Sequence, residues 1–260
     1  MNNEFVKNVG EILDRFYEFQ ERENTIYTEL IKPSLRFEEL GVKDTIVFFG
    51  SAVSLKNNNI PEILKNPDKT DKDTKILTMN RYYKDAEILS EKFTFWVRQK
   101  FQNINHCVVC SGGGPGIMEA ANKGAKLAGG NSMGLNIKIP NEQKPNVYQS
   151  DDLKFIFHYF FMRKYWFSYL AKAIVVFPGG FGTLDELFET YTLLKTNKTK
   201  QNIPVILYGK DYWQDIIDFE KMMEWGTIPE SFRDLIKIVD TVDDAFNYVK
   251  ENIVFSEETL

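Results

Sequence analysis

The sequence predicts an α/β fold: a doubly wound parallel sheet with helices on both faces. Short apolar runs rich in valine, isoleucine and phenylalanine alternate with helical patterns along the chain. Two of these runs end directly in a glycine-rich turn that opens a further helical pattern. Parallel strands need a crossover connection, which is usually a helix, so this alternation is typical of a parallel sheet covered on both sides.

The predicted strands are bounded by turn-forming or charged residues, and their interiors are almost continuously apolar. Such runs are typical of strands that are buried on both faces of a sheet. They lie at residues 45–50, 106–110, 132–140, 173–177, 203–209 and 236–240.

Helices are predicted between these strands. In residues 81–101, Ala86, Leu89, Phe93 and Val97 recur every three or four positions, which is the period of a helix. Residues 55–75 are rich in asparagine, lysine and aspartate and are predicted to form a solvated loop or a partly ordered insertion. The other predicted helices cover residues 117–128, 159–172, 184–195 and about 211–225, with a last one opened by Asp243 and Asp244.

We predict two parts of the chain: a helical N-terminal extension over residues 1–43 and a single nucleotide-binding α/β domain over residues 44–254. Apolar residues in the extension follow helical spacing. The extension could pack on its own domain or contact a second copy, and the sequence leaves both open. The spaced apolar residues are Phe5, Val9, Ile12, Phe16 and Phe19.

Composition excludes several classes of protein. The 260 residues are 43% hydrophobic and 27% charged, which is ordinary for a globular chain. Lys and Arg number 32 and Asp and Glu 37, and this net charge of −5 disfavours nucleic acid or an anionic membrane as a partner. No apolar run reaches about 18 residues and no signal peptide is evident, so we expect no membrane span and a cytoplasmic location.

Two cysteines, Cys107 and Cys110, lie in one predicted strand. Their odd spacing points the two thiols to opposite faces of the sheet, because side chains alternate along a strand. We therefore predict two buried structural thiols and neither a zinc site nor a redox pair.

The glycine-rich turns are the first functional signal. They are SGGGPG at residues 111–116 and PGGFGT at residues 178–183, and each joins the end of a strand to the start of a helix. Glycine lets the backbone approach a ligand closely, and a helix start offers unpaired N–H groups with a positive dipole end. Glycines alone can serve tight turns, but two such turns in one sheet favour a phosphate site.

The usual nucleotide fingerprints are absent. Ile117 and Asp185 stand where the third glycine of a dinucleotide-binding motif would be needed. Gly209-Lys210 is followed by Asp211, not by the Ser or Thr of a P-loop. A mononucleotide or a sugar phosphate remains as the ligand class.

An acidic residue and a pair of basic residues lie near the second turn in the sequence. Glu186 lies one turn into the helix after PGGFGT, and Arg163-Lys164 lies among aromatic residues. Acids in a first helical turn can simply complement the helix dipole, and a basic pair can simply be exposed. Beside two glycine turns that suit an anion, the carboxylate and the basic residues together favour cleavage at a sugar carbon, because a carboxylate stabilises an oxocarbenium-like transition state.

Three strings, SGGGPGIMEAA, FFMRK and PGGFGTLDE, resemble the signatures of the Lonely Guy family of cytokinin riboside 5′-monophosphate phosphoribohydrolases. The resemblance spans roughly residues 45–250, and the 23 positions from Arg163 to Glu186 match that family's spacing. The sequence looks most like the branch with an N-terminal extension, often described as AMP nucleosidases. Many family members carry the misleading label of lysine decarboxylase.

The resemblance implies a Rossmann-like hydrolase, usually a homodimer, that cleaves the N-glycosidic bond of nucleoside 5′-monophosphates without a cofactor or metal. It implies that Arg163 and Glu186 are the catalytic pair. The substrate-binding residues expected with it are Gly113, Gly114, Gly116, Lys164, Gly179, Gly180, Gly182, Thr183 and Glu189.

The sequence also departs from the family pattern. Phe160-Phe161 stand where the plant enzymes have Met-His, and Glu142 is only a substitute for an acidic binding residue of the family. These departures leave the preferred base open. The alternative function is a non-catalytic carrier of a nucleotide or of the molybdenum cofactor, since carriers resemble the family but would not require Arg163 and Glu186.

Overall fold

Seven parallel strands form one sheet in the computed structural model, in the order β4-β3-β2-β1-β5-β6-β7. The structure describes residues 3–53, 60–65, 68–139, 144–196, 198 and 203–257. The predicted doubly wound parallel sheet is confirmed. The strands are β1 (Asp44–Phe49), β2 (Cys107–Ser111), β3 (Ser132–Ile137), β4 (Lys154–Phe157), β5 (Ala171–Val176), β6 (Val205–Tyr208) and β7 (Lys237–Val239).

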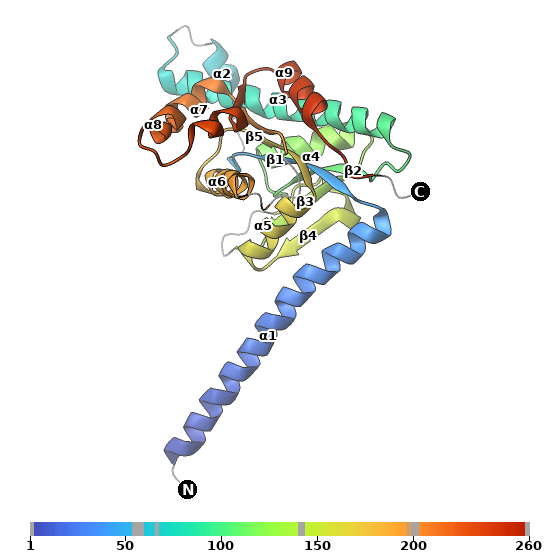
Figure 1. The fold of residues 1–260 in the computed structure, drawn as a ribbon, viewed down its shortest axis with the longest axis vertical. Coiled ribbons are helices and arrows are strands. Elements are labelled where there is room, and N and C mark those ends of the chain that lie inside the picture. Colours follow the sequence, from blue (N-terminus) through green and yellow to red (C-terminus); the bar gives the residue numbers. More distant parts are fainter. Residues whose placement is uncertain are drawn as a thin grey trace.

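Helices cover both faces of the sheet (Figure 1). One face packs against α3 (Asp71–Lys100), α4 (Ile117–Leu127) and α9 (Val242–Asn252). The other packs against α5 (Phe160–Tyr169), α6 (Phe181–Lys195), α7 (Lys210–Ile216) and α8 (Phe219–Glu224). The domain also contains a short helix α2 (Ile60–Lys65) and two 3₁₀ helices, Asp151–Leu153 and Glu230–Leu235.

The central strands are buried on both faces, as their apolar sequences predict. Along β1, Val47 and Phe49 belong to one apolar cluster and Ile46 and Phe48 to the other. The two cysteines behave the same way: Cys107 packs on one face and Cys110 on the other, and both thiols are free. Burial raises the pKa of each thiol, so both are held protonated and unreactive, which confirms the structural role predicted for them.

Strand β4 was not among the predicted strands. It lies at the edge of the sheet, with Phe155 and Phe157 buried and Lys154 and Ile156 exposed. Four residues are too few for an alternating pattern to stand out against the helix that follows in the sequence.

Residues 55–75, predicted to form a solvated loop or a partly ordered insertion, are helical in much of their described part. Residues 60–65 form α2, and α3 begins at Asp71, ten residues before the predicted start. A capping box explains the early start of α3: Thr70 Oγ1 accepts from the Asp73 N–H at 3.2 Å, and Asp73 accepts from the Thr70 N–H at 3.0 Å. Polar composition here marks a solvated helix face. Residues 54–59 and 66–67 lie outside the described residues.

The predicted helix near 211–225 is two helices. Helix α7 ends at Ile216, and Asp218 caps the next helix by accepting from the Lys221 N–H at 2.8 Å. An aspartate at this position therefore starts a new helix shortly after the first one ends.

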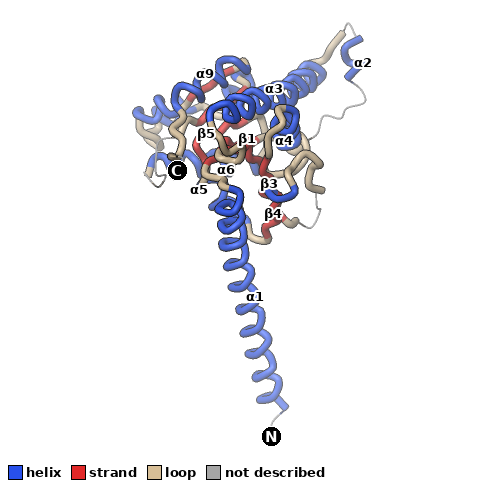
Figure 2. Tube along the Cα trace, turned by 90° about the vertical axis from the view of Figure 1, so that its right-hand side faces the viewer, coloured by secondary structure: helices blue, strands red, loops and turns tan. Residues whose placement is uncertain are grey.

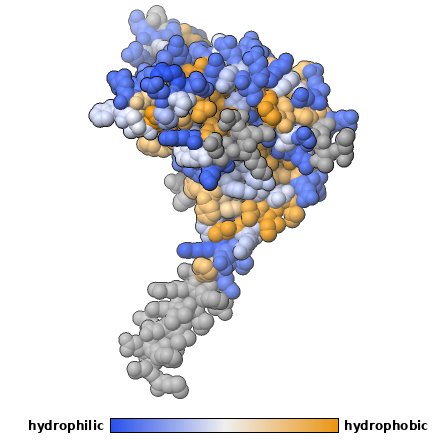
Figure 3. Space-filling view, viewed as in Figure 1, coloured by the Kyte–Doolittle hydropathy of each residue, from blue (hydrophilic) through white to orange (hydrophobic). Residues whose placement is uncertain are grey.

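Helix α1 (Asn3–Leu40) projects from the sheet domain (Figures 1 and 2). Its C-terminal half is anchored: the Phe37 ring packs edge-on against Phe155 and Trp166, and the Glu29 carbonyl accepts from Trp166 Nε1 at 2.9 Å. Figure 3 shows apolar surface where α1 leaves the domain, and the exposed Ile156 borders a hollow there together with Glu29 and Lys32 of α1. The apolar side chains of residues 5–16 lie outside the described ones, and the division at residue 43 stays a prediction.

Among the described residues, none of the helices is both long and apolar enough to cross a membrane.

Close packing of α4 on α3 generates a stability prediction. A Cβ at Gly124 would lie 2.1 Å from the Glu87 carbonyl oxygen and 2.9 Å from the Glu91 nitrogen. Gly124→Ala should therefore destabilise the protein by about 1–3 kcal/mol through overpacking, although alanine favours a helix by about 1 kcal/mol over glycine. Denaturant unfolding measures this free energy.

The matched control is Gly182→Ala in α6, where a Cβ would meet no described atom within 4 Å. This variant should be neutral or slightly stabilised. Equal free energies of unfolding for the two variants would contradict the packing described here.

Candidate functional site

A cleft of about 320 Å³ opens at the carboxyl ends of β1 and β5. Strand order reverses between these two neighbours, since β2 to β4 lie on one side and β6 and β7 on the other. Ligands of open α/β sheets bind at such a switch point. The residues lining the cleft are Phe49, Gly50, Ser51, Ala52, Val53, Gly112, Met118, Arg163, Phe167, Gly180, Gly182, Thr183 and Glu186.

The loop after β1 ties the two glycine turns together. The Ser51 N–H donates to the Pro178 carbonyl at 3.0 Å, and the Ser51 carbonyl accepts from the Ile117 N–H at 3.1 Å. Pro178 opens the second turn and Ile117 follows the first. No sequence pattern singled out this loop; the available signal was the position of Gly50-Ser51 directly after the first central strand.

The first turn is shaped by packing. Gly113 and Gly116 have φ values of +72° and +69°, and a Cβ at either would lie 2.2 Å from an oxygen, of Asn136 and of Ser51 respectively. Only glycine fits both positions. Of this turn, Gly112 lines the cleft, whereas Gly113, Gly114 and Gly116 hold its shape.

The second turn presents its glycines to open space. A Cβ at Gly180 or Gly182 would meet no described atom within 4 Å, and both residues line the cleft with Thr183. Gly179 instead packs against Thr183, and its carbonyl accepts from the Tyr212 hydroxyl at 2.6 Å. Because α6 starts here, its first N–H groups and the positive end of its dipole lie at the cleft.

Arg163 and Glu186 meet in the cleft. Arg163 Nη2 lies 3.5 Å from Glu186 Oε1, and the two side chains are only 14% and 7% exposed. The guanidinium also lies over the rings of Phe160 and Phe167, at 5.3 and 5.5 Å from their centroids. Arg163 Nε is buried without a hydrogen-bond partner among the described atoms.

Burial dominates the electrostatics of Glu186. It raises the pKa of this carboxyl from its ordinary 4.5 to about 7, although Arg163 and Lys164 act to lower it. Burial likewise lowers the pKa of Arg163, against the attraction of Glu186. A carboxyl that titrates near neutrality can exchange protons with a substrate at physiological pH.

Lys164 and Glu189 are not brought into this cleft. Lys164 Nζ pairs with Asp185 and with Glu189, both at 2.8 Å, and Lys164 and Glu189 border a separate hollow beside α5. Asp185 therefore has a partner besides the helix dipole. The binding roles expected for Lys164 and Glu189 stay predictions.

The described part of the chain contains no group of three or more His, Cys, Asp or Glu residues that could hold a metal ion. Glu142 lies outside the described residues.

The sequence of the chain is similar to that of a curated nucleotide nucleosidase. The chain is 27% identical to the pyrimidine/purine nucleotide 5′-monophosphate nucleosidase of Escherichia coli K12 over 154 residues, which is 55% of this chain and 33% of that protein. The chain therefore spans about a third of the length of that curated relative.

Solved structures share the architecture. The molybdenum cofactor binding protein from the phototrophic bacterium Rippkaea orientalis matches with a TM-score of 0.50 and 17% identity, over 80% of this chain and 96% of that one. At this identity the likeness concerns the fold alone. The molybdenum cofactor carrier protein from Chlamydomonas reinhardtii matches with a TM-score of 0.47 and 18% identity, over 80% and 97% of the two chains.

The profile of a family described as "Possible lysine decarboxylase" matches residues 118–249. The matched segment includes most of the second half of the domain, with Arg163, the PGGFGT turn and Glu186. Since the match covers 132 of the 260 residues, the chain belongs to this "Possible lysine decarboxylase" family.

Proposed function

We propose that the protein hydrolyses the N-glycosidic bond of nucleoside 5′-monophosphates, such as AMP or a cytokinin riboside 5′-monophosphate, to free base and ribose 5-phosphate. One observation carries the proposal: the buried Arg163–Glu186 pair shares a cleft with the open glycine turn at the start of α6. The turn suits the phosphate, and the pair suits the chemistry at the sugar.

The similarity to a nucleotide 5′-monophosphate nucleosidase supports the same reaction class. The resemblance of the three sequence strings to the Lonely Guy family points the same way. The homodimer and the cytoplasmic location expected from the sequence stay predictions.

In the proposed reaction, the bond between C1′ and the base nitrogen breaks, and its electron pair leaves with the base. The Glu186 carboxylate stabilises the oxocarbenium-like carbon that results. Water forms the new bond to C1′ and gives a proton to Glu186, which passes it to the departing base. Arg163 donates hydrogen bonds that orient the phosphoribosyl group and the base.

The family label of decarboxylase finds little support in the cleft. Amino-acid decarboxylation with pyridoxal phosphate needs a lysine that forms a Schiff base. Among the described residues that line the cleft, none is a lysine.

The alternative is a non-catalytic carrier of a nucleotide or the molybdenum cofactor. The fold likeness to molybdenum cofactor proteins is compatible with it but carries no functional argument at 17% identity. A carrier has no need of the buried Arg163–Glu186 pair in the cleft, so we favour the hydrolase.

Removal of the acid tests the proposal. Purified protein should release ribose 5-phosphate together with adenine from AMP, or with the corresponding base from a related monophosphate. Chromatography measures this release. Glu186→Gln should lower kcat at least about a hundredfold, the usual effect of removing one positioned acid or base. It should still bind AMP in calorimetry, because glutamine has the same size and still accepts from Arg163.

The matched control is Asp185→Asn, the same change one residue earlier, in a 56% exposed side chain that pairs with Lys164. Its kcat should stay within about fivefold of the native value, the scale of an exposed ion pair. Absence of turnover on every monophosphate by folded protein would refute the proposed function.

The pH dependence of kcat/KM provides a second test. Only the ionised carboxylate takes a proton from water, and the pKa of Glu186 is about 7 in the folded protein. The rate constant should therefore be full above pH 8 or so and fall about tenfold per unit as the pH drops below the pKa.

Lys164 lowers the pKa of Glu186, so Lys164→Met should move this inflection to higher pH. A profile that is flat between pH 5 and 9, or an inflection that stays in place in the variant, would show that Glu186 is not the titrating group.

A further inference from the structure

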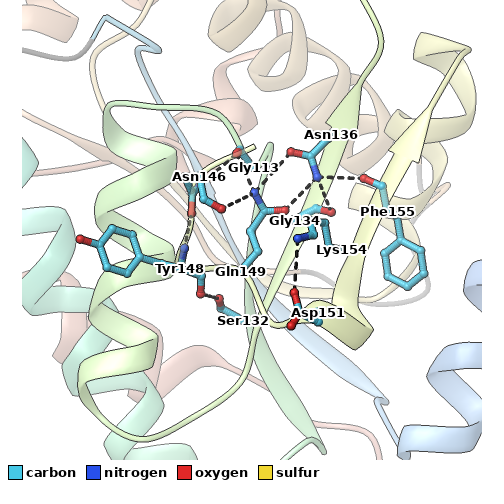
Figure 4. Close-up of polar contacts among 10 residues, drawn as sticks. All are labelled: Gly113, Ser132, Gly134, Asn136, Asn146, Tyr148, Gln149, Asp151, Lys154 and Phe155. Atoms are coloured by element: carbon cyan, nitrogen blue, oxygen red, sulfur yellow. Dashed lines mark hydrogen bonds and ion pairs between the residues drawn. The ribbon is translucent and has the colours of Figure 1, made fainter. Parts of the chain in front are cut away.

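We infer that Asn146 and Gln149 are positioning residues, whose amide side chains hold the first glycine turn in the conformation that receives the substrate. This inference rests on the proposed function. Both side chains are buried, at 8% and 6% exposure, and both come from the segment between β3 and β4 (Figure 4). Neither lines the cleft.

The amides converge on the carbonyl oxygens of the turn. The Gly113 carbonyl accepts from the Asn146 N–H at 2.8 Å, from Asn146 Nδ2 at 3.0 Å and from Gln149 Nε2 at 2.8 Å. Asn146 Nδ2 also lies 3.0 Å from the Gly114 carbonyl. Two successive carbonyl dipoles are thus drawn toward this segment.

Peptide geometry gives this attraction a consequence for the ligand. In a trans peptide the C=O and N–H groups point in opposite directions, so fixing the Gly113 carbonyl turns the Gly114 N–H away from Asn146 and Gln149. Strand β2, which carries the turn, lies between β3 and β1 in the sheet. The amide segment flanks the β3 side, whereas the cleft lies on the β1 side, so carbonyl oxygens that would repel a phosphorylated ligand are kept away from it.

The amides are themselves held in place. Asn136 Nδ2 donates to Gln149 Oε1 at 2.8 Å and to the Phe155 carbonyl at 2.9 Å. Asn122 Oδ1 accepts from Asn146 Nδ2 at 2.9 Å. A buried polar network whose members are satisfied is rigid, and an unsatisfied one is costly. Glycine at Gly134 belongs to the same fit, since a Cβ there would lie 1.8 Å from Gln149 Oε1.

Uncharged amides suit this task. A lysine or arginine in their place would draw the same carbonyls but would also attract the ligand's phosphate. Asparagine and glutamine supply donors without competing for the anion. The expected signature is therefore weaker substrate binding with little change in the chemical step.

The test is Gln149→Met, which keeps the volume of the side chain and removes its donors. KM for AMP should rise about tenfold, the scale of one lost hydrogen bond to a group that positions substrate. The value of kcat should change by less than about twofold, because Arg163 and Glu186 are untouched. Asn146→Ala, which leaves room for a water molecule, should show the same split if the methionine variant does not fold.

The matched control is Ser132→Ala. Its buried hydroxyl donates to the Tyr148 carbonyl at 3.0 Å, so it secures the same segment without touching the glycine turn. It should lose stability and keep KM. An unchanged KM in folded Gln149→Met and Asn146→Ala, or an equal rise in Ser132→Ala, would overturn the inference.

The experiment separates this inference from the function on which it rests. If the native protein turns over no monophosphate, the proposed function fails, and the dissociation constant of AMP from calorimetry replaces KM. A tenfold weaker dissociation constant in Gln149→Met, with the native constant kept in Ser132→Ala, would then support positioning. Equal constants in all forms, or no AMP binding by any form, would overturn it.

Discussion

The structure depends on one backbone bridge at the switch point of the sheet. Ser51 uses its N–H for the second glycine turn and its carbonyl for the helix that follows the first, so loops from β1, β2 and β5 are locked to each other. Gly50 and Gly116 are required by the same contact, since a Cβ at Gly50 would overlap Ile117 and one at Gly116 would overlap the Ser51 carbonyl. Tight packing of backbone on backbone thus holds the β1 loop and both glycine turns at one cleft.

The charge of the buried Glu186 carboxylate is only partly compensated by its surroundings. Burying a carboxylate is costly, and Arg163 offsets only part of that cost, because the pKa of Glu186 still rises to about 7. The folded protein therefore favours the protonated acid, and its stability from this group declines as pH rises from 4.5 toward 7. Sites that sacrifice stability in this way are typical of catalysis. Lys164, in contrast, pairs with two carboxylates at the rim of another hollow, so its positive charge is balanced.

Much of this could be predicted from the sequence, and the rest could not for physical reasons. Continuous apolar runs predicted six of the seven strands. The two glycine turns, Arg163 and Glu186 were also singled out from the sequence, and each contributes residues that line the cleft. Strand β4 was missed because an edge strand of four residues has little pattern, and the start of α3 was missed because composition concealed its capping box. The roles of Ser51, Asn146 and Gln149 depend on contacts between segments distant in sequence, for which no local pattern exists.

We propose that the first backbone amides of α6 hold the phosphate of a ribose phosphate. Amide resonances of the ¹⁵N-labelled protein during titration with ribose 5-phosphate measure this directly. We expect saturable shifts centred on Phe181 and Gly182, and no such shifts with ribose, which lacks the phosphate. Saturable shifts centred away from this turn, or equal shifts with both sugars, would contradict it.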